Sequence, residues 1–139
     1  MIFVDSNIPM YLTGSDDHLR AQAQGALERL ASGRRSLVTS SEVLQEVLHR
    51  YVSSGRRDAI EPVFEVIRAI VDEVFPVEEA DILVAKDLVH AHPKLSARDA
   101  VHAAVMRRRE ITEILSFDHG FDAVTGIRRL PAPDARHVV

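Results

Sequence analysis

The chain has 139 residues, of which 46% are hydrophobic, and this length and composition suit one folded domain and exclude a second. The absence of cysteine excludes disulfides, cysteine zinc sites and a thiol nucleophile. With 21 acidic and 17 basic residues, the net charge of −4 argues against nucleic-acid binding through bulk positive charge. No apolar run approaches the roughly 18 residues of a membrane span, and no signal peptide follows Met1, so we expect a cytoplasmic protein without membrane contact.

Apolar runs alternate with segments of helical periodicity, a pattern typical of an α/β fold with a mostly parallel sheet. The first half of the chain predicts a strand at 2–5, a turn at 7–9, a helix at about 17–30, a strand at 37–39 and a helix from the capping box at 39–42 to near 55. The middle predicts a helix at 58–71, a strand at 74–77 and a helix at 80–90. The last part predicts a helix from the capping box at 96–99 to about 108, a strand at 114–117, a loop or short helical turn at 118–126 and an edge strand at 127–130. Residues 131–139 are predicted to be a loose tail, which leaves 1–130 as the domain.

Two of the predicted strands end in an aspartate, Asp5 and Asp118. In an open α/β sheet the ligand crevice lies outside the carboxyl ends of the strands, so both carboxylates are expected at one rim. Asp99 lies in the first turn of a helix that faces the same rim, and Glu46 lies one turn into the helix after the second strand. The sequence therefore predicts that four carboxylates converge.

Clustered carboxylates oppose one another's ionisation unless a cation lies between them. Mg²⁺ and Mn²⁺ prefer such oxygen ligands and keep several bound waters. A metal held this way activates water and stabilises the oxygens that attack and leave a phosphorus centre. The cluster therefore points to hydrolysis of phosphodiester bonds.

Each carboxylate also has a structural explanation when it is taken alone. Asp5 could accept hydrogen bonds in the turn that follows it, Asp99 could complete the second capping box, and Asp118 could lie in a turn before a glycine. Glu46 could pair with an arginine four residues later, and Glu42 is a competing acid on the same helix. Only the joint pattern of spacing and strand ends favours a shared site.

Four short segments carry the more specific signal: Asp5-Ser6-Asn7, Ser41 to Val47, Ala97 to Ala104 and Ser116 to Asp122. Their order and spacing resemble the PIN-domain family, in particular the VapC-type toxins of bacterial and archaeal toxin–antitoxin pairs. The resemblance covers about residues 1–130. It implies a three-layer α/β/α fold with a mostly parallel central sheet, and a Mg²⁺-dependent or Mn²⁺-dependent endoribonuclease that hydrolyses RNA.

The resemblance also implies roles for individual residues. Asp5 and Asp99 match the principal metal ligands of the family, Glu46 matches its second acid and Asp118 its fourth. We therefore expect Asp5, Asp99 and Asp118 to hold the metal, and Glu46 to position the metal or the attacking water. Asp122 matches a frequent auxiliary acid. Two further expectations concern partners: a homodimer, and a cognate antitoxin whose C-terminal segment wraps the toxin and blocks the acidic pocket.

Other functions fit the sequence less well. A receiver-like phosphoacceptor needs a lysine at a late strand end, but Lys86 and Lys94 lie in or after a helix. A haloacid-dehalogenase-type phosphatase opens with Asp-x-Asp, where this chain has Asp5-Ser6-Asn7. A catalytically silent PIN-fold module for protein contacts stays open as the alternative, because a fold does not guarantee an activity.

The basic and aromatic residues give no clear RNA-binding motif. Arginines occur in tight groups that could bind phosphate or complement helix ends, and none is assigned to RNA. With no tryptophan, two tyrosines and five phenylalanines, a base-stacking platform is not evident. We expect structural or surface roles for the histidines, His102 among them, since a hard-cation site needs no imidazole.

Overall fold

The structure, a computed structural model, describes residues 1–130, and the predicted tail at 131–139 lies outside the described residues. Five parallel strands form one sheet in the order β3-β2-β1-β4-β5. Their bounds are β1 (Ile2–Val4), β2 (Leu37–Ser40), β3 (Glu73–Phe75), β4 (Glu113–Leu115) and β5 (Arg128–Leu130). The parallel sheet confirms the predicted fold class.

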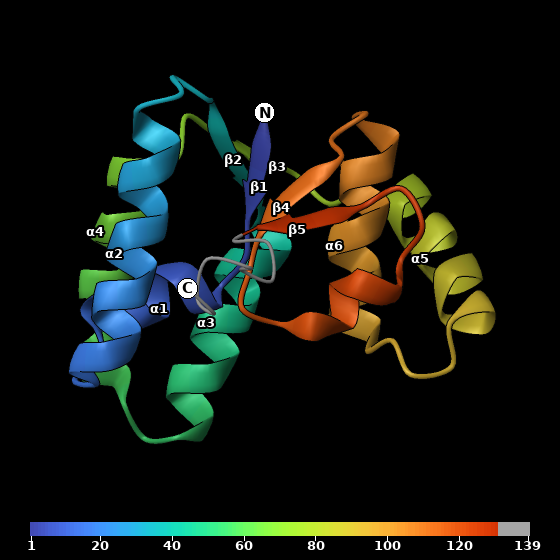
Figure 1. The fold of residues 1–139 in the computed structure, drawn as a ribbon. Coiled ribbons are helices and arrows are strands. Elements are labelled where there is room, and N and C mark those ends of the chain that lie inside the picture. The colour runs from blue at the N-terminus through green and yellow to red at the C-terminus, as the bar shows by residue number, and fades with distance from the viewer. Residues whose placement is uncertain (131–139) are drawn as a thin grey trace.

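Helices cover both faces of this sheet (Figure 1). They are α1 (Asn7–Thr13), α2 (Asp17–Ala31), α3 (Ser41–Ser53), α4 (Ile60–Ile70), α5 (Glu79–Ala91) and α6 (Ala97–Arg108), with short 3-10 helices η1 (Arg57–Ala59) and η2 (His119–Ala123). Figure 1 shows α2 and α4 on one side of the sheet and α5 and α6 on the other, which gives three layers. Within residues 1–130, none of the helices has both the length and the apolar character to cross a bilayer.

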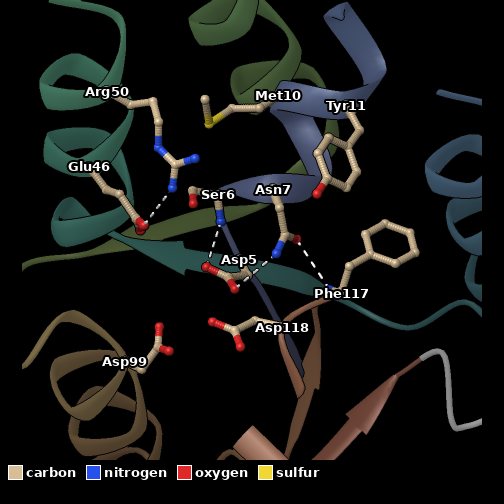
Figure 2. A pocket seen from close by; sticks show the side chains of 10 residues that line it. All are labelled: Asp5, Ser6, Asn7, Met10, Tyr11, Glu46, Arg50, Asp99, Phe117 and Asp118. Carbon is tan, nitrogen blue, oxygen red and sulfur yellow. Dashed lines mark hydrogen bonds and ion pairs between the residues drawn. The ribbon is translucent and has the colours of Figure 1, made fainter. Parts of the chain in front are cut away.

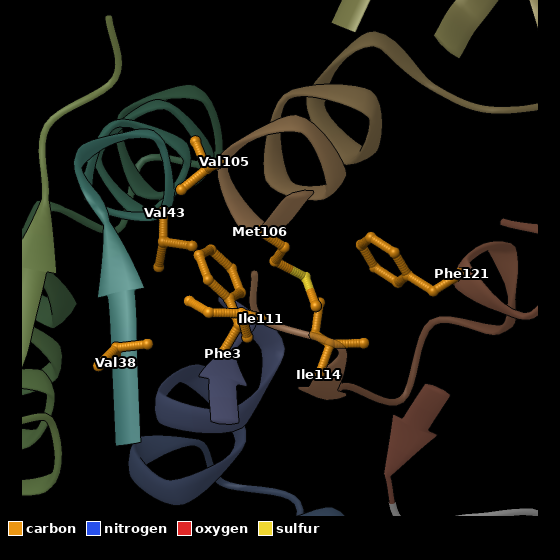
Figure 3. Packing of buried hydrophobic residues seen from close by; sticks show 8 residues of the cluster. All are labelled: Phe3, Val38, Val43, Val105, Met106, Ile111, Ile114 and Phe121. Carbon is orange, nitrogen blue, oxygen red and sulfur yellow. The ribbon is translucent and has the colours of Figure 1, made fainter. Parts of the chain in front are cut away.

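Alternate side chains of the central strands fill two separate cores, as the period of two in a strand requires. Phe3 of β1 and Ile114 of β4 pack toward α3 and α6 in a cluster of buried residues that Figure 3 shows: Phe3, Val38, Val43, Val105, Met106, Ile111, Ile114 and Phe121. Ile2, Val4 and Leu115 pack on the opposite face against α1 and α2. Burying each large apolar side chain contributes roughly 1.5–3 kcal/mol, so the central strands are held from both faces.

The structure corrects one predicted element. The sequence predicts a turn at 7–9, but residues 7–13 form helix α1. Pro9 falls in the first turn of this helix, where its missing N–H leaves no hydrogen bond unmade. Met10 N–H donates to the Ser6 carbonyl oxygen at 3.2 Å, so the helix continues through the proline.

Candidate active site

Asp5 is fixed at the carboxyl ends of the two central strands. Val4 of β1 pairs with Leu115 of β4, and the next residue, Asp5, donates its N–H to the Leu115 carbonyl oxygen at 3.1 Å. The buried Asp5 carboxylate accepts hydrogen bonds from Ser6 N–H at 2.8 Å and from Ser116 Oγ at 2.6 Å. Asn7 Nδ2 donates to the same carboxylate at 3.4 Å (Figure 2). Asp5 therefore has one orientation set by its neighbours.

Asp118 comes from the loop after β4, which ends two residues earlier than predicted. Its N–H donates to Ser116 Oγ at 2.9 Å, and its Oδ1 accepts the Gly120 N–H at 2.8 Å. Asp118 therefore lies in the turn before a glycine that the sequence predicted as one possibility. Its side chain also lines an open pocket at this edge of the sheet. The structural and functional explanations of this residue are therefore compatible.

Asp99 enters the pocket from the first turn of α6. Its N–H donates to Ser96 Oγ at 3.1 Å, so the backbone of Asp99, rather than its carboxylate, completes the helix cap. A Cβ added at Gly120 would lie 3.1 Å from Asp118 Oδ1 and 3.5 Å from Asp99 Oδ2. Both carboxylates therefore lie close to Gly120, at the position that a larger residue would fill with its side chain.

Glu46 is buried on α3 and contacts a histidine. His102 Nε2 lies 3.2 Å from Glu46 Oε1 and 3.7 Å from Asp5 Oδ1, and His102 is fully buried. His102 Nδ1 has no hydrogen-bond partner within residues 1–130. Asp5, Glu46 and His102 each offer a ligand atom, and these atoms lie within 4.8 Å of one another. The sequence reasoning left His102 outside the site, although its position three residues after Asp99 on an alanine-rich helix was a usable signal.

The ionisation of these groups depends on burial and on one another. Burial, together with the neighbouring Asp118 carboxylate, raises the pKa of Asp99 to about 7, and burial also raises the pKa of Asp5. Burial opposes the charge on Glu46, but the hydrogen bond and charge of His102 outweigh it and lower the Glu46 pKa. Burial likewise opposes the charge on His102, yet its bond to Glu46 and the charge of Asp5 raise its pKa. The cluster thus pairs His102 with Glu46, whereas burial and neighbouring carboxylates oppose the ionisation of Asp5 and Asp99.

The four predicted carboxylates share one open pocket of about 260 Å³ (Figure 2). It is lined by Asp5, Ser6, Asn7, Met10, Tyr11, Glu46, Arg50, Asp99, Phe117 and Asp118. Asp122 and Glu42 do not line it. Arg129 Nε holds the Asp122 carboxylate at 2.9 Å and lowers its pKa, so this predicted auxiliary acid is engaged in an ion pair instead.

Most arginines that occur in tight groups along the sequence form ion pairs with acidic residues of the same chain. Arg108 and Arg109 bind Asp81, and Arg35 and Arg128 bind Glu113. Two isolated arginines instead flank the acidic pocket. Arg50 lies 3.8 Å and Arg98 3.7 Å from Glu46 Oε2, and their side chains are 54% and 44% exposed.

Comparison with known proteins decides the family. The family model described as PIN domain matches residues 2–127. The chain belongs to the PIN domain family. Ribonuclease VapC13 of Mycobacterium tuberculosis is 52% identical to this PIN domain over 130 residues, which cover 94% of this chain and 99% of that protein. The match confirms the predicted family and the predicted ribonuclease class.

Solved structures agree with the fold of this PIN domain. VapC20 of Mycobacterium tuberculosis, described as a sarcin-ricin loop cleaving toxin, superposes with a TM-score of 0.70 and 26% identity, covering 88% of this chain and 94% of that one. A toxin–antitoxin complex from Klebsiella pneumoniae gives a TM-score of 0.66 at 17% identity, with coverage of 92% and 96%. At that identity the second similarity concerns the fold alone.

Proposed function

We propose that this PIN domain is a Mg²⁺-dependent endoribonuclease, with Mn²⁺ as an alternative metal, and that it is the toxin of a VapBC-type pair in the cytoplasm. The observation that supports this most directly is the convergence of Asp5, Glu46, Asp99 and Asp118 on one open pocket. The relatives named as VapC ribonucleases support the same function.

In this proposal Asp5, Asp99 and Asp118 hold the metal. Their all-oxygen donor set suits Mg²⁺ or Mn²⁺, and a divalent cation would offset the burial and the neighbouring carboxylates that raise the pKa values of Asp5 and Asp99. A bound metal would supply an activated water and positive charge beside the scissile phosphate.

The residues of the chain prepare the pocket for this chemistry. Ser116 and Asn7 fix the Asp5 carboxylate, so it needs no reorganisation when the RNA binds. His102 keeps Glu46 ionised, and Glu46 then accepts a hydrogen bond from the attacking water and orients it. His102 is a positioning residue in this scheme because it acts through Glu46.

Replacement of single carboxylates tests the proposal. Asp5→Asn and Asp99→Asn should each slow RNA cleavage in Mg²⁺ by about a hundredfold or more, the scale on which one lost electrostatic contact to a reacting centre acts. Asp87→Asn is the matched control, since Asp87 is an exposed acid on α5 outside the pocket. Cleavage is measured on purified, folded variants checked by circular dichroism. An Asp5→Asn protein that cleaves as fast as the parent contradicts the assignment.

A homodimer and a cognate antitoxin that blocks the acidic pocket complete the proposal. The similarity to VapC20, which is described as a toxin and is 26% identical, supports such a partner. Expression of the chain alone should arrest growth, and co-expression with its neighbouring small reading frame should restore it. Growth arrest in neither case would favour the catalytically silent interaction module, and sedimentation of the purified chain measures the oligomeric state.

A further inference from the structure

One wall of the acidic pocket is aromatic. Tyr11 of α1 and Phe117, which follows β4, lie with their ring centroids 5.4 Å apart and their planes inclined at 36°. Both rings are half-buried and line the pocket beside the carboxylates (Figure 2). The pocket therefore offers ring surface next to the proposed metal ligands.

Asn7 holds this wall in a fixed place relative to the acids. Its Nδ2 donates to Asp5 Oδ2 at 3.4 Å and to Ser116 Oγ at 3.3 Å. Its Oδ1 accepts the Phe117 N–H at 3.4 Å. The side-chain amide of Asn7 thus connects Asp5, a proposed metal ligand, with the backbone of Phe117. The fold therefore sets the distance between Asp5 and the aromatic wall.

The opposite wall is basic. Figure 2 shows Arg50 beside Glu46, across the pocket from Tyr11 and Phe117. Within residues 1–130, the ion pairs of Arg50 and Arg98 with Glu46 are long, and both side chains stay about half exposed, so their guanidinium groups have N–H donors available for another anion. Guanidinium groups bind phosphate oxygens with good geometry. The pocket thus has an acidic floor between a wall suited to phosphate and a wall suited to an aromatic ring.

We propose that Tyr11 and Phe117 form a base-stacking subsite for one nucleobase of the RNA beside the scissile phosphate, with Arg50 and Arg98 holding the backbone on the other side. The proposal rests on the proposed ribonuclease function and adds how the strand lies in the site. Aromatic stacking accepts every base because each has a π-face, so this subsite positions the strand and selects single-stranded RNA.

The fluorescence of Tyr11 tests the contact directly. The chain has two tyrosines and no tryptophan, so a Tyr51→Phe background leaves Tyr11 as the only strong emitter. A short oligouridylate, added with Ca²⁺ in place of Mg²⁺, should quench this emission after correction for absorbance. An abasic ribose-phosphate oligomer of the same length should bind about tenfold more weakly and should leave the emission unchanged.

Substitutions separate stacking from simple packing. Tyr11→Leu should bind oligouridylate about tenfold more weakly, raise KM for RNA by a similar factor with kcat nearly unchanged, and lose the preference for the oligomer that carries bases. Tyr11→Phe keeps the ring and should behave as the parent. Phe117→Leu is the second variant should Tyr11→Leu fail to fold, as judged by circular dichroism.

Each result has a definite meaning. If RNA cleavage is lost in Asp5→Asn but folded Tyr11→Leu binds oligouridylate as tightly as the parent, the stacking subsite is wrong and the ribonuclease function stands. Equal binding of abasic and base-carrying oligomers to the parent also overturns the subsite. If the folded parent neither binds nor cleaves RNA, both proposals fail.

Discussion

Asp99 is the carboxylate of the site that depends most on its surroundings. Burial and the neighbouring Asp118 raise its pKa to about 7, so near neutral pH a proton and a cation compete for it. At the proposed metal site, binding would release this proton and should strengthen as the pH rises. The same competition makes Asp99 a source of pH-dependent stability in the metal-free protein.

We expect the metal-free protein to lose stability as the pH rises from about 4 to 7, between the unfolded and folded pKa values of Asp99. The folded pKa of Asp99, about 7, lies above the ordinary value of 3.8, so between them the folded state retains a proton that the unfolded state releases. The raised pKa of His102 acts in the same direction, because its stabilising charge is lost as the pH passes that value. Thermal unfolding in EDTA measures the effect, and Asp99→Asn should flatten the slope.

Mg²⁺ supplies the control for this prediction. By replacing the proton on Asp99, the metal should raise the melting temperature more at pH 8 than at pH 5. Stability of the metal-free protein that is constant or rises across this range would show that Asp99 and His102 do not carry their raised pKa values.

The sequence placed individual residues well where strand ends define them. Asp5 and Asp118 follow strands that alternate with helices, and the parallel sheet brings such ends to one rim. His102 could not be placed this way. Its contact with Glu46 joins residues 56 positions apart, and the alanine-rich α6 is buried on several faces, so periodicity does not show which face meets the pocket.

Among the elements, α6 links helix capping to the site. Ser96 caps the helix through the Asp99 N–H, the same residue whose carboxylate enters the pocket. Each strand was predicted from a short apolar run to within two residues at each end. Helix α1 was missed because Asn7 and Pro9 favour a turn when their tertiary contacts are unknown. In the structure Ile8 of α1 is fully buried against the sheet, and this packing favours the helix.

Ser96→Ala should lower the free energy of unfolding by about 1 kcal/mol, the usual cost of losing a side-chain cap. Urea unfolding followed by circular dichroism measures the change. Ser54→Ala is the matched control, since this exposed serine at the end of α3 only bonds the Tyr51 carbonyl oxygen at 3.4 Å. Equal unfolding free energies for the two variants would show that the cap contributes nothing.

At the scale of the whole molecule, the distribution of charge disfavours RNA binding in the absence of a cation. The net charge is −4, the pocket concentrates carboxylates, and most grouped arginines are engaged in ion pairs within the protein. The arginines beside the pocket, Arg50 and Arg98, are about half exposed and stay partly free for phosphate. In the proposed function, a divalent cation in the pocket would offset this negative charge where the RNA backbone would pass.

RNA should accordingly bind weakly in EDTA and more tightly when Ca²⁺ occupies the site without supporting cleavage. Fluorescence anisotropy of labelled oligouridylate measures the difference. Asp99→Asn, which removes one negative charge from the pocket, should reduce the dependence on Ca²⁺. Equal affinity with and without the cation, in the parent protein, would place the RNA on another surface.

The order of the strands also bears on when activity can arise during synthesis. β4 lies next to β1 at the centre of the sheet, and Asp118 lies far along a chain of 139 residues. A nascent chain that ends before β4 lacks a neighbour of the central strand β1 and one of the four acids. In the proposed ribonuclease, a chain that ends before β4 cannot form the acidic pocket, so such a truncated chain should be inactive.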